Sequence, residues 1–416
     1  MLPHLQSALG IGAIIAIAWA LSEDRKVFHW RMVAGTLVAQ ALIAVLLLKV
    51  SFVRELLFGL NSVVVALSDA TRAGTSFIYG FLGGGPTPFA VTQPANMINL
   101  AFGVLPLIIV ISSLSAILWY WRILPAIVGV MALLLKRSMG LGGAVGLSAA
   151  ATVFLGNVEG QLVIRPYLGR LNRTELFVLM TVGLSVIAGT VFVLYATLLQ
   201  NVLPGALGQL LVASMMSLPG GILIARIMVP GPADTDLKDK DATIKYHSTM
   251  DAMSRGTEDG LKIYLQVVAM LIVMTALTAL VNIILSGLPP VFGAPLTVER
   301  ILGWLFAPMV WLYGVPWNQA ATAGSLAGIK VVLTELIAYV RMAALPPGTL
   351  DPRATQIMVY AMCGFGNLAS VGILIGGMSA IIPERRQEIV SLAMKALVSG
   401  TLASGLTGAM IGLLPL

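Results

Sequence analysis

The sequence predicts an all-α polytopic membrane protein with about eight transmembrane helices, two opposed re-entrant hairpins and several interfacial helices, arranged as an inverted repeat. Three observations support this class: a composition of 58% hydrophobic and 10% charged residues, two acids in apolar surroundings, and two apolar segments interrupted by glycine. A soluble domain would carry about a quarter charged residues. The mean hydropathy of +0.94 also indicates a chain that lies in a lipid bilayer.

The cysteine count and the charge limit the possible partners. One cysteine, Cys363, excludes an internal disulfide and a cysteine-based metal site. The net charge of +7 does not require nucleic acid, because Lys and Arg in cytoplasmic loops account for it. We therefore expect no nucleic-acid partner, no cofactor and no certain metal site.

The apolar stretches set the order of the elements. Eight of them are predicted to span the membrane: 7–21, 33–50, 98–121, 172–199, 207–229, 260–285, 351–382 and 388–414. Three amphipathic or short segments are predicted to be interfacial helices: 51–80, 123–135 and 299–313. Two further stretches are predicted to be hairpins, 140–168 and 316–342, and 230–256 is predicted to be a solvated loop.

The first predicted hairpin contains Gly156-Asn157-Val158-Glu159 inside an otherwise apolar run. A carboxylate is costly in a bilayer and is by default a functional residue. The alternative is a charge at a helix end that reaches the membrane surface, or one neutralised by a buried partner. Gly156 favours a turn near the middle of the run, and irregular backbone there requires a protein-lined cavity.

The second half of the chain repeats this arrangement. Glu335 also lies in apolar surroundings, and an arginine follows six residues after each acid. Each copy is followed by a span that glycine interrupts, nine residues after a threonine: Thr174 to Gly183 and Thr355 to Gly364. Paired, interrupted segments in corresponding positions are typical of the midplane binding site of a transporter.

The distribution of Lys and Arg predicts the topology. Loops between spans 1–2, 3–4, 5–6 and 7–8, with the span ends beside them, hold eighteen of the twenty-five basic residues. The positive-inside rule makes that side cytoplasmic and both termini periplasmic. Three spans separate the hairpins, so the second copy is inverted. The predicted units are a mainly scaffold unit of residues 1–122, a first transport repeat 123–229, a loop and scaffold span 230–300, and a second transport repeat 301–416.

The candidate site combines Glu159, Glu335, two amides (Asn157 and Asn367) and the Ser370 hydroxyl, with Phe365 beside them. No Arg or Lys is predicted at the hairpin tips or helix interruptions, which argues against an anionic ligand. Carboxylates accept hydrogen bonds from vicinal hydroxyls, and an aromatic ring covers a flat group. The set fits a neutral polyhydroxylated ligand with a planar group.

These motifs resemble the concentrative nucleoside transporter family from about residue 95 to the C-terminus. The matching motifs are Gly156-x-x-Glu159 with Leu162-Val-Ile-Arg165-Pro166, Gly314-Val315-Pro316-Trp317, Glu335-x-x-Ala338-Tyr339 and Cys363-Gly364-Phe365-Gly366-Asn367. The resemblance implies a homotrimer in a bacterial inner membrane that imports nucleosides by cation-coupled symport and alternating access. Another neutral polyhydroxylated or nucleobase-like solute on the same fold is the alternative.

The resemblance also implies roles for individual residues. Ribose contacts fall on Glu335, Asn367 and Ser370. Nucleobase contacts fall on the base-facing set, which is Gly156, Asn157, Val158, Glu159, Phe365 and Val191. The family usually has Gln-Thr where this chain has Asn157-Val158, so the base-facing side differs.

The resemblance places the coupling cation beside the first hairpin and the interrupted fourth span. The aligned sodium-ligand positions are Thr152 and Val186, and Val186 has no side-chain oxygen for a hard cation. This favours H+ over Na+, with Glu159 as the proton carrier because desolvation favours its neutral form. Ser185 and backbone carbonyls leave sodium as the alternative.

Two other classes of protein are weaker interpretations. An intramembrane enzyme would need a nucleophile or metal set, and the three histidines have no metal-ligand spacing. A passive channel would not need duplicated interrupted helices with buried acids. We therefore expect a transporter and not an enzyme.

Overall fold

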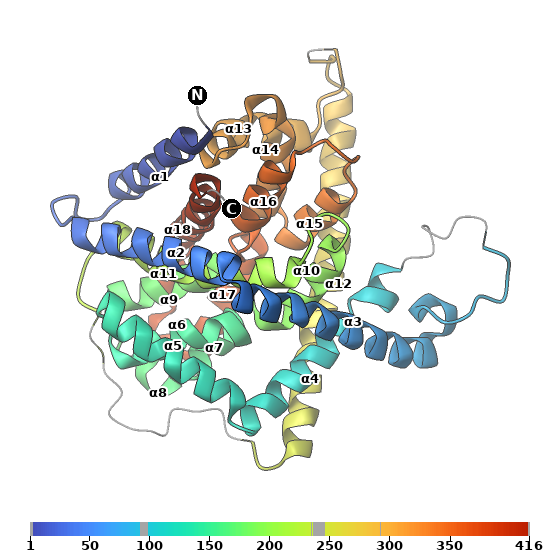
Figure 1. Ribbon diagram of the computed structural model, residues 1–416, viewed down its shortest axis with the longest axis horizontal. Coiled ribbons are helices and arrows are strands. Elements are labelled where there is room, and N and C mark those ends of the chain that lie inside the picture. Colours follow the sequence, from blue (N-terminus) through green and yellow to red (C-terminus); the bar gives the residue numbers. More distant parts are fainter. Residues whose placement is uncertain (1–2, 92–98, 234, 236–245, 292, 415–416) are drawn as a thin grey trace.

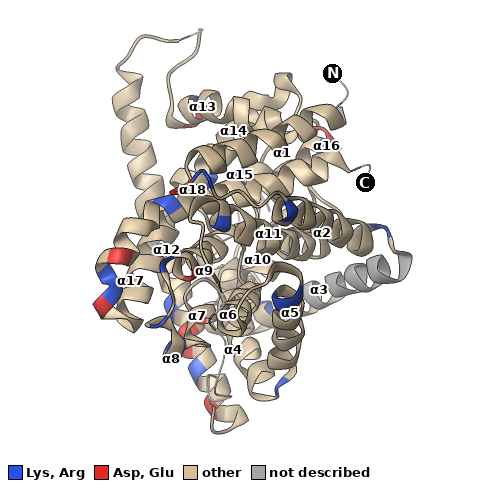
Figure 2. Ribbon diagram, turned by 90° about the vertical axis from the view of Figure 1, so that its left-hand side faces the viewer, with Lys and Arg blue, Asp and Glu red and all other residues tan. Residues whose placement is uncertain are grey.

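The computed structural model describes residues 3–91, 99–233, 235, 246–291 and 293–414, and the described residues are almost entirely helical (Figure 1). The predicted loop residues 236–245 and the predicted start of the third span at Ile98 lie outside them. Charged residues are sparse along most of the helices (Figure 2). The predicted class of helical polytopic membrane protein is confirmed.

The N-terminal third of the chain begins with three long helices. They are α1 (Pro3–Ala20), α2 (Trp30–Lys49) and α3 (Ser51–Tyr79), followed by the short η1 (Gly80–Gly83). These helices contact the later region of the chain: α1 packs against α18, and α2 and α3 contact α11 (Figure 1). The third predicted span is a π-helical turn, η3 (Leu100–Val104), followed by α4 (Leu107–Tyr120).

A similar order of elements then occurs twice, except that α8 is present in the first set alone and η4 in the second alone. The first set is α5 (Ile123–Met139), α6 (Gly143–Leu155), α7 (Glu159–Leu162), α8 (Arg165–Leu168), α9 (Arg173–Ser185), α10 (Gly189–Leu199) and α11 (Ala206–Met228). The second set is α13 (Val298–Tyr313), α14 (Trp317–Val332), α15 (Glu335–Ala343), α16 (Pro352–Met362), α17 (Leu368–Ile381), η4 (Pro383–Arg385) and α18 (Arg386–Leu413). The sets pack on each other, since α18 contacts both α9 and α11.

Between the two sets lies α12 (Thr249–Ser286), which packs along α4. It is longer than the predicted span 260–285, so the boundary of the predicted loop at residue 256 was wrong. The Ser248 hydroxyl accepts a hydrogen bond from the Asp251 amide at 3.1 Å and caps the helix. The exposed first turns of α12 also contain an ion pair between Arg255 and Asp251 at 2.9 Å. Such local interactions extend a helix through a polar sequence that hydropathy assigns to a loop.

Six described helical segments are long and apolar enough to cross a bilayer. They are Trp30–Lys49, Leu100–Tyr120, Arg173–Leu199, Ala206–Met228, Thr249–Ser286 and Pro383–Leu413. The predicted first span is a shorter apolar helix, and the predicted seventh span is divided into α16 and α17.

The first acid-bearing run is interrupted at Gly156, as the sequence predicts. Gly156 has φ 117° and ψ −178°, a conformation that is essentially limited to glycine. After it the chain turns back on α6, and the Ser148 hydroxyl donates to the Gly160 carbonyl at 3.0 Å. The run is therefore a helical hairpin and not one continuous helix.

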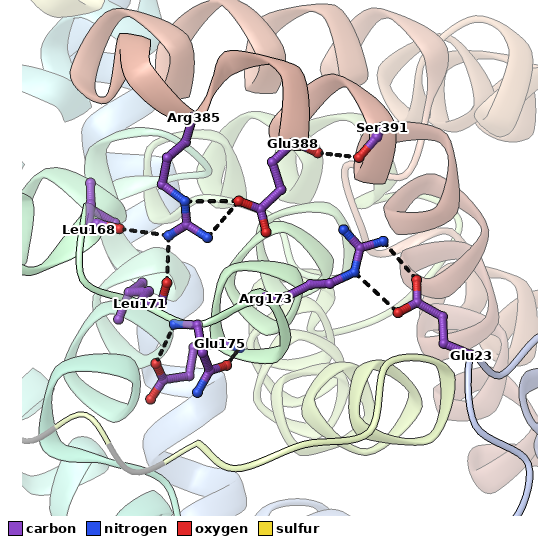
Figure 3. A network of polar contacts seen from close by, with 9 residues as sticks. Glu23, Leu168, Leu171, Arg173, Glu175, Arg385, Glu388 and Ser391 are labelled. Atoms are coloured by element: carbon purple, nitrogen blue, oxygen red, sulfur yellow. Dashed lines mark hydrogen bonds and ion pairs between the residues drawn. The ribbon is translucent and has the colours of Figure 1, made fainter.

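A polar network joins the two sets at the ends of α8, α9 and α18 (Figure 3). The Arg385 guanidinium donates to the carbonyls of Leu168 at 3.2 Å and Leu171 at 2.6 Å. The Arg173 guanidinium donates to both carboxylate oxygens of Glu23, at 2.8 and 3.1 Å. The loop after α1 is thereby tied to the start of α9.

We expect Gly156→Ala to destabilise the protein, because alanine at this φ and ψ costs about 1–3 kcal/mol. The added Cβ would also lie 2.9 Å from the Glu159 Oε2 atom. The melting temperature of the purified protein measures the effect. Gly129→Ala on α5 is the control, since no atom lies within 4 Å of its Cβ position. Equal melting temperatures for the two variants would contradict the assignment.

We also expect Glu23 to make a pH-dependent contribution to the stability of the folded protein. The hydrogen bonds from Arg173, and then the Lys395 ammonium group at 3.1 Å, hold the pKa of Glu23 below its ordinary value, against an opposing effect of partial burial. The stabilisation is fully present above the unfolded-state pKa of about 4.3 and is lost as the pH falls through the lower folded-state value.

The measurement for Glu23 is the melting temperature of the wild type and of Glu23→Gln across pH. The wild type should melt higher at neutral pH, and the difference should shrink below pH of about 4. Its size should be under about 1 kcal/mol, since the pair is partly exposed. A difference that grew with acidification would exclude this role.

Candidate functional site

Four helix interruptions surround one cavity of about 170 Å³, the central cavity. The interruptions fall at 156–158 between α6 and α7, 186–188 between α9 and α10, 333–334 between α14 and α15, and 363–367 between α16 and α17. Each of them contributes lining residues, and the helices beside them contribute more, chiefly α10, α15 and α17; α4 and α12 complete the lining. The duplicated interruptions that the sequence predicts therefore meet at one place.

All nine predicted substrate-binding residues line the central cavity: Gly156, Asn157, Val158, Glu159, Val191, Glu335, Phe365, Asn367 and Ser370. They come from both halves of the chain. The Phe365 ring is half-buried in the lining, so its exposed portion is available to a ligand.

The Glu335 carboxylate is the most closely held group in the central cavity. The Tyr195 hydroxyl donates to its Oε1 atom and the Asn367 amide to its Oε2 atom, both at 2.7 Å. Glu335 lies in the first turn of α15, where a negative charge interacts favourably with the helix dipole. The side chain is 4% exposed, so these partners compensate for the loss of water.

Asn367 is oriented by the backbone that follows it. It is the N-cap of α17, and its side-chain oxygen accepts a hydrogen bond from the Ser370 amide at 2.7 Å. This bond leaves the NH2 group facing Glu335. The interruption before α17 thus fixes a hydrogen-bond donor beside the acid.

The tip of the first hairpin also lines the central cavity. Glu159 lies in the first turn of α7 and is half-buried in the cavity lining. Asn157 is buried, and neither polar atom of its side chain has a hydrogen-bond partner among the described residues. An unpaired buried amide costs about 1–3 kcal/mol. The Asn157 amide is packed against α9, since a Cβ on Gly183 would lie 2.1 Å from its Oδ1 atom, so the side chain must turn toward the cavity before a ligand can pair with it.

The two interrupted spans contact each other directly. The Phe365 amide donates to the Val186 carbonyl at 3.2 Å. A Cβ on Gly364 would lie 2.7 Å from the Ser185 carbonyl oxygen, so only glycine permits this approach. Backbone groups that the interruptions leave free are thereby paired inside the protein.

The cation-coupling candidates Thr152 and Ser185 do not line the central cavity. The Thr152 hydroxyl donates to the Ser148 carbonyl at 2.8 Å, and the Ser185 hydroxyl donates to the Val182 carbonyl at 3.1 Å. Both side chains are buried. Of the three candidates for coupling, only Glu159 reaches the central cavity.

Sequence reasoning missed Tyr195, Gln266 and Lys330. Tyr195 follows Val191 by one helical turn, and Gln266 is an amide within the apolar α12; both line the central cavity. Their positions in apolar helices were signals that could have identified them.

Lys330 corrects the expectation that no basic residue lies near the interruptions. It is three residues before the interruption at 333–334, and its side chain is buried. It does not line the central cavity, and its ammonium group donates to the Ser404 hydroxyl at 3.2 Å. The argument against an anionic ligand therefore holds for the central cavity itself.

Family profiles match most of the chain. "Na+ dependent nucleoside transporter C-terminus" matches residues 209–412, "Na+ dependent nucleoside transporter N-terminus" matches residues 9–82, and "Nucleoside recognition" matches residues 101–201.

Curated relatives are similar along the full chain. The nucleoside permease NupC of Helicobacter pylori is 34% identical over 98% of this chain and 97% of its own length. The uncharacterized transporter YutK of Bacillus subtilis is 36% identical over 98% of this chain and 99% of its own length. The sodium/nucleoside cotransporter 1 of Rattus norvegicus is 27% identical over 99% of this chain and 64% of the rat protein.

Solved structures are likewise similar to this protein along nearly its full chain. CNTnw in an inward-facing substrate-bound state has a TM-score of 0.90 and 36% identity, covering 99% of this chain and 98% of that one. A doubly substituted CNTnw in an outward-facing state has a TM-score of 0.89 and the same identity and coverage. The sequence, the fold and the cavity at four helix interruptions therefore agree, and the chain belongs to the concentrative nucleoside transporter family, which is a family of membrane transporters and not of enzymes.

Proposed function

We propose that this protein imports nucleosides across the bacterial inner membrane by cation-coupled symport with alternating access, and that the coupling cation is H+. The observation that carries the proposal is the Glu335 carboxylate, held by Tyr195 and Asn367 in the central cavity. The names of NupC and of the rat cotransporter support a nucleoside substrate. Another neutral polyhydroxylated or nucleobase-like solute is the second candidate.

The ribose is assigned to Glu335, Asn367 and Ser370. Each Glu335 oxygen accepts one hydrogen bond within the protein, and a carboxylate oxygen has capacity for a second. Two vicinal hydroxyls of a ribose can supply those bonds. Because Tyr195 and Asn367 keep the carboxylate in place, little ordering of the protein opposes binding.

The nucleobase is assigned to the side of the central cavity that carries Asn157, Val158 and Phe365. When the Asn157 side chain turns from Gly183 toward the cavity, its unpaired amide supplies one donor group and one acceptor for the polar edge of a base. The exposed portion of the Phe365 ring offers an aromatic surface to its planar face. This side of the cavity distinguishes a nucleoside from a simple sugar.

A proton is favoured as the coupling ion for two reasons. Val186 has no side-chain oxygen, and its carbonyl already accepts a hydrogen bond from Phe365. The Thr152 and Ser185 hydroxyls each donate to a carbonyl of their own helix. Sodium coupling is the alternative, as in the name of the rat relative. It would need the oxygens at these positions to exchange hydrogen bonds for metal coordination.

The membrane arrangement belongs to the same proposal. The hairpins α6–α7 and α14–α15 enter from opposite faces, both termini are periplasmic, and a homotrimer forms around the scaffold. The distribution of Lys and Arg supports this topology, and the family resemblance supports the trimer. The repeats 123–229 and 301–416 would move substrate relative to the scaffold, which comprises residues 1–122 and 230–300.

We expect Glu335→Gln to weaken nucleoside binding about 10- to 150-fold. The reason is the loss of charge-assisted hydrogen bonds worth about 1.5–3 kcal/mol. Tyr195→Phe removes one hydrogen bond that positions the acid and should have a smaller effect. The measurement is the dissociation constant for uridine and adenosine with purified protein. Glu384→Gln, an exposed acid outside the cavity, is the control. Normal binding by a well-folded Glu335→Gln protein would refute the ribose assignment.

We expect an inward proton gradient to drive nucleoside accumulation in sodium-free proteoliposomes. Glu159→Gln should abolish this accumulation and retain binding, because the amide resembles the protonated acid. Nucleoside counterflow, which needs no gradient, shows that the variant is inserted and active. Accumulation driven fully by sodium and not at all by protons would reject proton coupling and leave the nucleoside assignment intact.

A further inference from the structure

A second cavity, of about 730 Å³, lies between α2, α5 and α11. We call it the α2–α5 cavity. It shares no lining residue with the central cavity, so substrate binding does not account for it. Figure 1 shows α2 running across α11, with α5 nearby.

One end of the α2–α5 cavity is basic. Its lining contains His29 and Arg31 at the start of α2 and Arg226 near the end of α11. The half-buried Arg226 guanidinium donates to the Met139 carbonyl at 2.9 Å, which fixes it beside the end of α5. No Asp or Glu is among the lining residues.

The rest of the lining is apolar and opens sideways. It includes Leu46 on α2 and Leu134 on α5, which are 57% and 61% exposed. From Arg31 to Leu46 the helix rises about 22 Å, at 1.5 Å per residue. Half of the hydrocarbon core of a bilayer is about 15 Å thick, so the groove is long enough for an acyl chain. Its open apolar side would face lipid.

We propose that the α2–α5 cavity binds one anionic phospholipid, with its phosphate at Arg31 and Arg226 and an acyl chain along the apolar portion. Guanidinium groups bind phosphate oxygens through paired hydrogen bonds. The basic end lies on the side that the Lys and Arg distribution makes cytoplasmic, where anionic lipids attract basic groups. The charge of the lining thus selects an anionic headgroup over a zwitterionic one, and the bound lipid fills the space between α2 and α5.

Native mass spectrometry of the detergent-purified protein tests the headgroup. The probes are phosphatidylglycerol and phosphatidylcholine with identical acyl chains. The wild type should retain one phosphatidylglycerol in preference to phosphatidylcholine. Arg31→Gln should weaken phosphatidylglycerol binding about fivefold, while Arg386→Gln, an exposed arginine outside the cavity, should not change it.

A second pair of variants tests the position of the acyl chain. Gly35 lines the cavity, and no atom lies within 4 Å of its Cβ position, so the side chain of Gly35→Leu begins in open space and occupies part of the groove. Gly12→Leu on α1 is the matched control, because its Cβ position is equally free and lies outside the cavity.

Loss of the retained lipid in Gly35→Leu but not in Gly12→Leu would support the site. Equal retention of the two headgroups by the wild type would overturn the proposal. So would equal lipid binding by the two leucine variants, since the bound lipid would then be a non-selective surface layer.

Discussion

The need to pair polar groups inside the protein governs this structure. A bilayer offers no hydrogen bonds, so each helix interruption must find partners within the fold. The structure meets this need by placing interruptions against one another: the Phe365 amide of one meets the Val186 carbonyl of another. Gly364 permits this contact because a side chain there would collide with Ser185. The packing of α18 on α9 and α11 holds the two sets of helices in that position.

The same constraint produces the chemistry of the central cavity. The Glu335 charge is acceptable there because Tyr195, Asn367 and the start of α15 compensate for its desolvation. These partners also fix the direction in which its remaining lone pairs can bind a ligand. Asn157, in contrast, has no partner among the described residues. The Glu335 carboxylate is thus preorganised, whereas the Asn157 amide is unpaired and must turn away from Gly183 before a ligand can pair with it.

Cations have distinct roles in different regions of the molecule. Lys330 is buried within the second hairpin, and its ammonium group donates to Ser404 and lies beside Gly366, although Lys330 does not line the central cavity. Arg173 and Arg385 join the loop after α1, the end of α8 and α18 through exposed or half-buried contacts (Figure 3). The central cavity is therefore suited to a neutral solute even though the chain has a net charge of +7.

Several features could be predicted from the sequence because their physical causes are local. Hydropathy over about 20 residues identifies a membrane helix, and an acid or a glycine inside such a run identifies a possible interruption. Gly156 shows this directly, since its conformation is one that glycine alone tolerates. The nine predicted residues, all of which line the central cavity, were identified from the repeat of these signals and from the family motifs. The start of α12 was not predicted correctly, because hydropathy assigns its polar first turns to a loop.

Only the tertiary structure decided which of these groups meet. Tyr195 and Glu335 are 140 residues apart in the chain, and their hydrogen bond depends on how α10 and α15 are placed. The burial of Lys330 and the α2–α5 cavity likewise depend on packing between distant helices. The sequence alone determined the membrane class, the duplicated interruptions and the candidate residues for a polar solute. Their partners and distances required the fold, because pairing energy depends on separation in space and not on position along the chain.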